Sequence, residues 1–322
     1  MDASHIWNSF LPFFSASSTQ TFLKNCYHRQ GIQDSELKSY ENSYPFIYYL
    51  EHGQIYYQQA KHAPLTIQPI LLFYGFVHLI KACILIMDPN YPETTSVLAH
   101  GVSTRKRKKQ HYLFFQDEVK FQKSGLFPFM AYKLFHMKHL EGEKTTMMEL
   151  LAQIPELNEL FILTEGKQTF IKINQHETSF SLSKTILDSY HMTEQRFIDY
   201  WKSITHPNIH FQEMNNDDIR FHLTYSNSEE LLPIKYSIYD QNLYFPLEKN
   251  NLTLYPELLI HYLLLYNLSM IARYETEWWS ELIKLMPNQD YPFIQSFLTI
   301  TAEKGPFLIN QFLANNNKRR GI

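Results

Sequence analysis

The side chains best suited to chemistry form a run of five cations, Arg105 to Lys109, in a chain whose net charge is only -3. Neighbouring like charges repel one another, so a folded domain keeps such a run where water or an anionic partner neutralises it. Guanidinium and ammonium groups are also the side chains that contact phosphate. Arg105, Lys106 and Arg107 are therefore predicted to bind an anion, and the alternative is a solvated loop without a ligand.

Histidines stand on both sides of this run. His100 lies before Gly101, and its imidazole could act as a general acid or base, could donate to an anion, or could simply close a loop. His111 follows the run two positions later. His100, Arg105 and His111 are thus candidates for catalysis, although their pattern assigns no reaction.

Polar residues form a regular stripe on the apolar segment 70–85, which is predicted to be a central buried helix. Tyr74, His78 and Lys81 are spaced by four and three residues, which places them on one side of a helix. A buried lysine is costly unless it is paired. Lys81 is therefore expected to meet a carboxylate such as Asp88, or to reach solvent or a ligand.

A second stripe ends in a cation near the other end of the chain. Tyr262, Tyr266, Ser269 and Arg273 follow helical spacing in the apolar segment 258–272 and just beyond it. Arg273 could cap the carbonyl end of that helix, where a positive charge is favourable. A ligand-binding role would require Arg273 to lie beside His100 and the cationic run.

These residues must be positioned by a mixed set of helices and strands, so the predicted fold class is α+β. Helical spacing and helix breakers predict helices over 44–61 (with Ile47, Leu50, Ile55 and Tyr56 on one side), 70–85, 145–161 with a break at Pro155, 194–203, 258–272 and 277–286. Alternating patterns predict a hairpin within 112–132 that turns at Ser124-Gly125, and strands over 170–173, 209–212, 219–225 and 234–239.

Composition narrows the class of protein. The pI near 6.6 argues against a general coat of nucleic acid, and nine glycines disfavour a glycine-rich phosphate loop. Two cysteines cannot form a disulfide framework, and the fifteen histidines show no metal-ligand spacing, so neither a metal nor a cofactor is predicted. The start of the chain lacks the pattern of a secretory signal, and the most apolar window contains His78 and Lys81, so we expect a cytoplasmic protein outside the membrane.

Several segments resemble those of the YaaC-like proteins of bacilli over nearly the whole chain. They are 72–75, 98–102, 104–108 and 268–275. The resemblance by itself implies no particular reaction. It does imply a link to purine nucleotides, because relatives are often encoded beside the gene for IMP dehydrogenase, which makes that enzyme a possible protein partner.

A second, partial resemblance is to the HEPN helical domains, through the aromatic segment 73–82 and the Ala99-His100-Gly101 loop. It implies a helical bundle, nucleotide binding or cleavage of RNA, and pairing as a homodimer. In HEPN ribonucleases an arginine is followed by a histidine at the spacing of Arg105 and His111, although Lys106 departs from the polar residue usual there. The expected parts are a HEPN-like helical part (1–111), a hairpin with short helices (112–165), a β-rich part (166–255), and C-terminal helices that pack back on the bundle (256–322).

Together these observations favour a regulatory or interaction protein that binds a nucleotide-like phosphorylated ligand or an acidic partner surface. The predicted binding residues are Tyr74, His78, Lys81, His100, Arg105, Lys106, Arg107 and Arg273. The alternative is a metal-independent ribonuclease that uses Arg105 with His111 or His100, in which the arginine stabilises the phosphorane and the histidine moves a proton.

Overall fold

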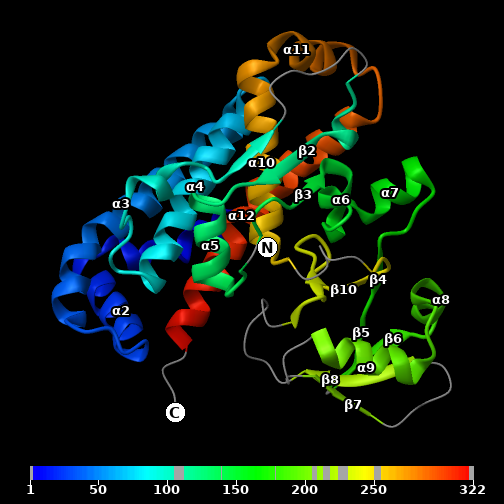
Figure 1. The fold of residues 1–322 in the computed structure, drawn as a ribbon, viewed down its shortest axis with the longest axis horizontal. Coiled ribbons are helices and arrows are strands. Elements are labelled where there is room, and N and C mark those ends of the chain that lie inside the picture. The colour runs from blue at the N-terminus through cyan, green and yellow to red at the C-terminus, as the bar shows by residue number, and fades with distance from the viewer. Residues whose placement is uncertain are drawn as a thin grey trace. The chain divides into compact units, whose positions relative to one another are not determined.

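The computed structural model describes residues 3–104, 112–138, 140–177, 179–204, 209–212, 218–223, 231–249 and 255–318. Helices and antiparallel sheets are both present, which confirms the α+β class (Figure 1). The helices are α1 (Ala3–Asn8), α2 (Ala16–Arg29), α3 (Ser35–His62), α4 (Gln68–Met87), α5 (Leu126–Phe135), α6 (Met147–Leu151), α7 (Asn158–Glu165), α8 (Ile186–Tyr190), α9 (Glu194–Ile204), α10 (Glu257–Tyr274), α11 (Thr276–Leu285) and α12 (Asp290–Lys318). The strands are β1 (Val102–Thr104), β2 (Glu118–Phe121), β3 (Lys144–Thr146), β4 (Phe170–Lys172), β5 (Asn174–Gln175), β6 (Phe180–Ser183), β7 (Ile209–Phe211), β8 (Asp218–Leu223), β9 (Lys235–Tyr236) and β10 (Leu243–Pro246).

The chain forms two compact units. The first contains residues 1–148 and 261–322, and the second contains residues 149–260. Each unit has its own buried apolar residues, and each is described separately below.

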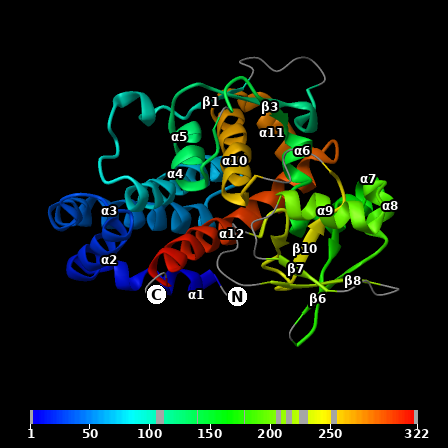
Figure 2. The ribbon, with the colours of Figure 1, turned by 60° about the horizontal axis from the view of Figure 1, so that its bottom comes forward.

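The first unit is built around α4. Residues of α2, α3, α5 and α12 all contact this helix, and Figures 1 and 2 show α3 and α12 running beside it. By length and composition alone α4 could cross a membrane, but 67% of its most apolar window is buried inside the structure. That burial is consistent with a core helix of a soluble protein, and the predicted central buried helix is confirmed.

The helix α3 differs from its prediction in two respects. It begins at Ser35 rather than at Tyr44 and continues through Pro45, because the packing of α2 and α4 along it compensates for the one backbone hydrogen bond that proline removes. Leu50 and Ile55 were predicted to share a side, yet Leu50 is buried and Ile55 is 47% exposed. Five residues turn a helix by more than a third of a circle, so the two side chains point in different directions.

The contact between α3 and α4 is close because a glycine from each helix lies in it. A Cβ atom on Gly53 would stand 2.5 Å from a methyl carbon of Leu79, and one on Gly75 would stand 2.8 Å from the ring of Tyr57. Real Cβ atoms do not approach other atoms this closely, so neither position has room for a larger side chain. These two glycines therefore fix how near the aromatic face of α3 lies to α4.

The predicted hairpin within residues 112–132 is wrong. β2 pairs with β1 and β3 in an antiparallel three-stranded sheet, and its partners come from outside that segment. Gly125 does not turn the chain into a second strand but precedes α5, with a φ of +121°. Residues 126–135 are apolar on a helical period, which overrides the weak local signal for a turn.

The same sheet changes the start of another predicted element. The helix expected over 145–161 begins later, because Lys144–Thr146 forms β3, and α6, a short 3-10 turn (Pro155–Leu157) and α7 follow. The predicted break at Pro155 is confirmed. The remaining 3-10 turns cover Leu11–Phe14, Thr95–Leu98 and Phe114–Gln116.

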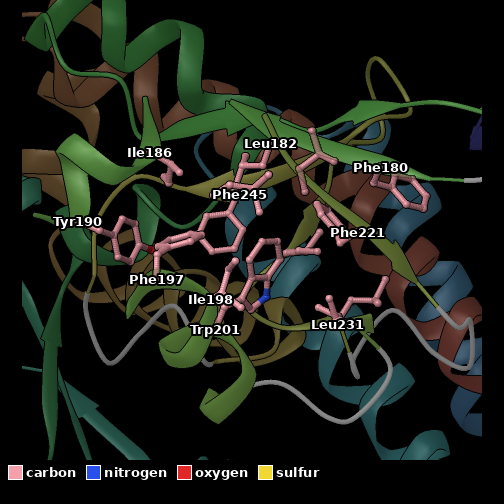
Figure 3. Packing of buried hydrophobic residues seen from close by; sticks show 14 residues of the cluster. Phe180, Leu182, Ile186, Tyr190, Phe197, Ile198, Trp201, Phe221, Leu231 and Phe245 are labelled. Atoms are coloured by element: carbon pink, nitrogen blue, oxygen red, sulfur yellow. The ribbon is translucent and has the colours of Figure 1, made fainter. Parts of the chain in front are cut away.

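The second unit contains two antiparallel sheets, with strand orders β4-β10-β9 and β5-β6-β8-β7. The predicted strands correspond to β4, β7, β8 and β9, and the predicted helix over 194–203 is α9. Trp201 of α9 is fully buried, and its ring centroid lies 4.5 Å from that of Phe245 and 5.0 Å from that of Phe221 (Figure 3). These aromatic rings join α9 to both sheets in one core.

Candidate functional site

Five of the predicted binding residues lie together in the first unit. Tyr74, His78 and Lys81 come from α4, His100 from the loop before β1, and Arg273 from the last turn of α10. We call these five residues the basic cluster. All five side chains are partly exposed, so solvent and a solute can reach the cluster.

Arg273 joins the two helices of the basic cluster. Its Nε donates to the carbonyl oxygen of Ser269, one turn earlier in α10, at 3.0 Å, and its charge lies in the last turn of that helix, where a cation is favourable. Its Nη1 also donates to the hydroxyl of Tyr74 at 3.1 Å, and the guanidinium lies 5.7 Å from the centre of that ring. The structure therefore places Arg273 beside Tyr74 of α4, whereas the cationic run, which a ligand-binding role also requires, lies outside the described residues.

Backbone hydrogen bonds fix the loop that carries His100. The carbonyl oxygen of Ala99 accepts from the backbone N–H of Leu126 at 2.7 Å, which fastens the loop to the start of α5. The carbonyl oxygen of His100 accepts from the backbone N–H of Phe127 at 3.1 Å and from the hydroxyl of Tyr262 at 2.8 Å. These bonds hold the backbone of His100 in place, and the contacts of its imidazole are made with other side chains.

Two glycines make this fastening possible. Gly101 has a φ of +78°, which disfavours residues with a side chain, and a Cβ there would stand 2.9 Å from the backbone nitrogen of Phe127. Gly125 faces Gly101 in the same close backbone contact. The His100-Gly101 pair indicates a turn in the sequence. Only the fold shows that Gly101 packs against the start of α5.

Aromatic rings and two cations surround the imidazole of His100. Its ring centroid lies 5.1 Å from that of Phe73 and 5.5 Å from that of Tyr266. Burial lowers the pKa of His100, and the positive charges of Arg273 and Lys81 lower it further. The imidazole is therefore neutral at neutral pH and can accept a proton or a hydrogen bond.

His78 lies in a similar but more aromatic setting. Its ring stacks on that of Tyr56 at a centroid distance of 5.6 Å, and the ring of His52 lies 5.2 Å away. Burial, followed by the charges of Lys81 and His52, lowers the pKa of His78 to about 4. Its Nδ1 is buried and has no hydrogen-bond partner within the described part of the chain.

Lys81 does not pair with Asp88, contrary to the expectation from sequence. Asp88, the residue that follows the last turn of α4, forms an ion pair with Lys133 of α5 at 2.6 Å. Lys81 instead places its ammonium 5.7 Å from the centre of the Tyr49 ring. Burial lowers the pKa of Lys81, in keeping with a cation that is partly desolvated.

Among the residues that the structure describes, no carboxylate pairs with the two cations of the basic cluster, Lys81 and Arg273. No carboxylate is among the charges that shift the pKa of His78 or His100. The cluster therefore carries an uncompensated positive potential that an anion would neutralise.

The helix α3 contributes aromatic residues that the sequence pattern did not assign to the site. Tyr49 and Tyr56 are seven residues apart and face α4, where they contact Lys81 and His78. Their spacing of two helical turns was a usable signal, but the sequence pattern placed Tyr56 on an apolar side with Ile55. Tyr266 was noted for its position in a stripe, and the structure adds its contact with His100.

The cationic run lies outside the described residues, since β1 ends at Thr104 and the description resumes at Tyr112. The roles of four residues therefore remain predictions from the sequence: Arg105, Lys106, Arg107 and His111. The site as built here rests on the basic cluster and its aromatic neighbours.

Comparison with known proteins gives one match. The family model described as YaaC-like Protein matches residues 11–313, which include residues from both compact units and all five residues of the basic cluster. No curated protein and no solved structure matches the chain.

Proposed function

This chain belongs to the YaaC-like family, and we propose that its basic cluster binds a phosphorylated, nucleotide-like ligand, so that the protein acts as a regulatory or interaction protein. The observation that carries this proposal is the uncompensated charge. Lys81 and Arg273 both depress the pKa of His100, and within the described residues neither cation is paired with a carboxylate. A bound phosphate would remove the mutual repulsion of these groups.

The side chains divide the recognition between charge and ring faces. Arg273 uses Nε and Nη1 internally, whereas its Nη2 has only the weak contacts with Met270 and with the hydroxyl of Ser269, at 3.2 and 3.4 Å, and is available to a phosphate oxygen. Lys81 adds a point charge. Tyr56 and Tyr74, whose ring centroids are 6.3 Å apart, offer apolar faces to a base.

Thermal unfolding of the full chain tests this proposal. We expect GMP, IMP and GTP to raise Tm, because a ligand that binds only the folded state at about 100 times its Kd adds about 2.7 kcal/mol of stability. Inorganic phosphate should give a smaller rise and guanosine less still, since each supplies one part of the ligand. Lys81→Gln and Arg273→Gln should remove the shift.

The controls are two exposed lysines of the same unit. Lys61→Gln at the end of α3 and Lys284→Gln on α11 each remove one positive charge away from the basic cluster, and the shift should persist in both. An undiminished shift in Arg273→Gln would contradict the proposed site. The same assay applied to Arg105→Ala with Arg107→Ala tests whether the cationic run contributes.

Two finer expectations accompany this proposal. The helical first unit is proposed to be a HEPN-type bundle in a cytoplasmic protein, and the family resemblance makes IMP dehydrogenase the first partner to test. An acidic protein surface could use the same positive potential as a nucleotide. Binding of purified IMP dehydrogenase that is lost in Lys81→Gln and Arg273→Gln would favour the partner over a free nucleotide.

Ribonuclease activity is the second candidate, and one observation favours it. His100 is neutral and stands beside the charge of Arg273, the combination needed for a general base next to a group that stabilises a phosphorane. Purified protein incubated with total RNA and a metal chelator would then cleave it, and His100→Ala or His111→Ala would abolish cleavage. Intact RNA together with a nucleotide-dependent rise in Tm would reject the ribonuclease and support the binding function.

A further inference from the structure

Five large apolar and aromatic side chains are exposed along one side of α3. Leu37, Tyr40, Tyr44, Tyr48 and Ile55 are between 47% and 66% exposed. With about 100° of turn per residue, they lie within about 60° of one line that runs about 27 Å along the helix. We call these five residues the tyrosine band. Folded monomers seldom leave so long an apolar surface in water, so a partner surface is expected.

Four of the five residues of the tyrosine band are spaced symmetrically along the helix. Leu37 and Ile55 are equally far from position 46, and so are Tyr44 and Tyr48. Phe46 itself is fully buried on the opposite side of α3. Tyr40, the fifth member of the band, has the polar His52 as its counterpart about position 46, and the exposed Glu41 and Glu51 are also equally far from that position.

We infer that the tyrosine band is the surface through which two copies of this chain pair, with their α3 helices antiparallel about a twofold axis at position 46. In a twofold contact, the residue that touches its counterpart is touched by it in return. Leu37 then faces Ile55 of the second copy, and Tyr44 faces Tyr48. A twofold contact requires a surface that is symmetric about the axis. A contact with an unrelated protein does not require this symmetry.

The edges of the band are complementary in this arrangement. On an ideal helix Glu41 and His52 fall on one edge, whereas Tyr40 and Glu51 fall on the other. The twofold axis brings Glu41 beside His52 of the second copy and the hydroxyl of Tyr40 beside the carboxylate of Glu51. Each acidic side chain thus meets a donor, and the two copies of each glutamate stay about 15 Å apart along the helices.

The contact has a defined strength and a link to the basic cluster. A single pair of helices covers less than the roughly 800 Å² per partner of a standard interface, so we expect a dimer that dissociates in the micromolar range. His52 belongs both to the edge of the band and to the surroundings of His78, whose ring lies 5.2 Å away. Pairing therefore places a carboxylate of the second copy next to a neighbour of the basic cluster.

The association state of the full chain provides the first test. Sedimentation from about 1 µM to about 100 µM should show a reversible monomer–dimer equilibrium, the range in which such a contact is half-formed. Tyr44→Glu combined with Tyr48→Glu should weaken it roughly tenfold or more, because four charges would meet at the axis. Leu163→Glu on α7, whose side chain is 82% exposed, is the matched control and should dimerise like the native chain.

Orientation provides the second test. Tyr44→Cys and Tyr48→Cys chains should cross-link to each other when mixed, because position 44 faces position 48 in the antiparallel pair. Each variant alone should cross-link far less, because neither position faces itself. The native cysteines are buried and should add little background. Leu163→Cys measures random collision. A native chain that stays monomeric throughout the range, a dimer that survives the double glutamate variant, or equal cross-linking of Tyr44→Cys with itself would each overturn the inference.

Discussion

At the scale of single residues, the basic cluster shows how a few side chains change character through their neighbours. His78 is an ordinary histidine in the sequence, yet in the fold it is stacked on Tyr56 and lies near Lys81. Partial burial and positive charge both oppose its protonation, so they act in the same direction on its pKa. The same two causes act on His100, which makes the two imidazoles proton acceptors rather than cations.

The titration of His78 leads to a prediction about stability. Its pKa is about 4 in the folded chain, below the ordinary value of 6.5, so the unfolded chain binds more protons between these two values. The free energy of unfolding should therefore be highest above about pH 6.5 and should fall as the pH drops toward 4. Urea unfolding at several pH values measures this fall.

The variant His78→Gln isolates the contribution of this side chain. It cannot take up a proton, so the decline in stability from pH 7 to pH 4.5 should become shallower than in the native chain. Lys61→Gln, which changes an exposed residue on α3 outside the basic cluster, should leave the decline unchanged. An identical decline in the native chain and His78→Gln would show that other groups dominate.

At the scale of secondary-structure elements, the two glycines between α3 and α4 set the geometry of the site. They let the helices approach closely enough for Tyr49 to reach Lys81 and for Tyr56 to stack on His78. Propensity alone would favour alanine at both positions. Their presence in the middle of long helices is therefore explained by packing.

Gly75→Ala tests this explanation by the sign of its effect. In an exposed helix the change would stabilise by about 1 kcal/mol. Here the new Cβ would stand 2.8 Å from the Tyr57 ring, and overpacking of this kind costs about 1–3 kcal/mol. Chemical unfolding should show a net loss of stability, together with a smaller nucleotide-dependent shift in Tm. A gain in stability would mean that the helices can move apart without cost.

At the scale of the whole molecule, the chain keeps its candidate site in one unit and a separate aromatic core in the other. Trp201, Phe221 and Phe245 hold the second unit together, and none of them belongs to the basic cluster. The basic cluster, by contrast, is drawn from residues almost two hundred positions apart that all fall in the first unit. Damage to the second core should therefore affect stability more than ligand binding.

Phe245→Ala measures this separation. Removal of a fully buried phenylalanine should lower the free energy of unfolding by about 3–5 kcal/mol. The variant should have a lower Tm than the native chain. Nucleotide should still raise that Tm by as much as it raises the Tm of the native chain. Tyr239→Ala, which removes a ring that is 57% exposed in the same unit, should change stability little. A lost nucleotide shift in Phe245→Ala would show that the site depends on the second unit.

The sequence by itself determined the elements whose signal is local and strong. The apolar run of α4, the helices that correspond to α9 and α10, and the break at Pro155 were all predicted, because helical periodicity and proline act within a few residues. It also selected Tyr74, His78, Lys81 and Arg273, since polar side chains on apolar helices are costly and need a reason, and His100, since it lies before Gly101 near the cationic run.

Only the tertiary structure decided which of these residues meet and what surrounds them. The predicted hairpin at Ser124-Gly125 does not form, because β2 pairs with strands from outside that segment. Lys81 does not pair with Asp88, because Asp88 forms an ion pair with Lys133 of another helix. The aromatic face of α3 and the contact of Arg273 with Tyr74 likewise depend on helix packing. Such long-range choices are set by which surfaces exclude water together, and no local pattern records them.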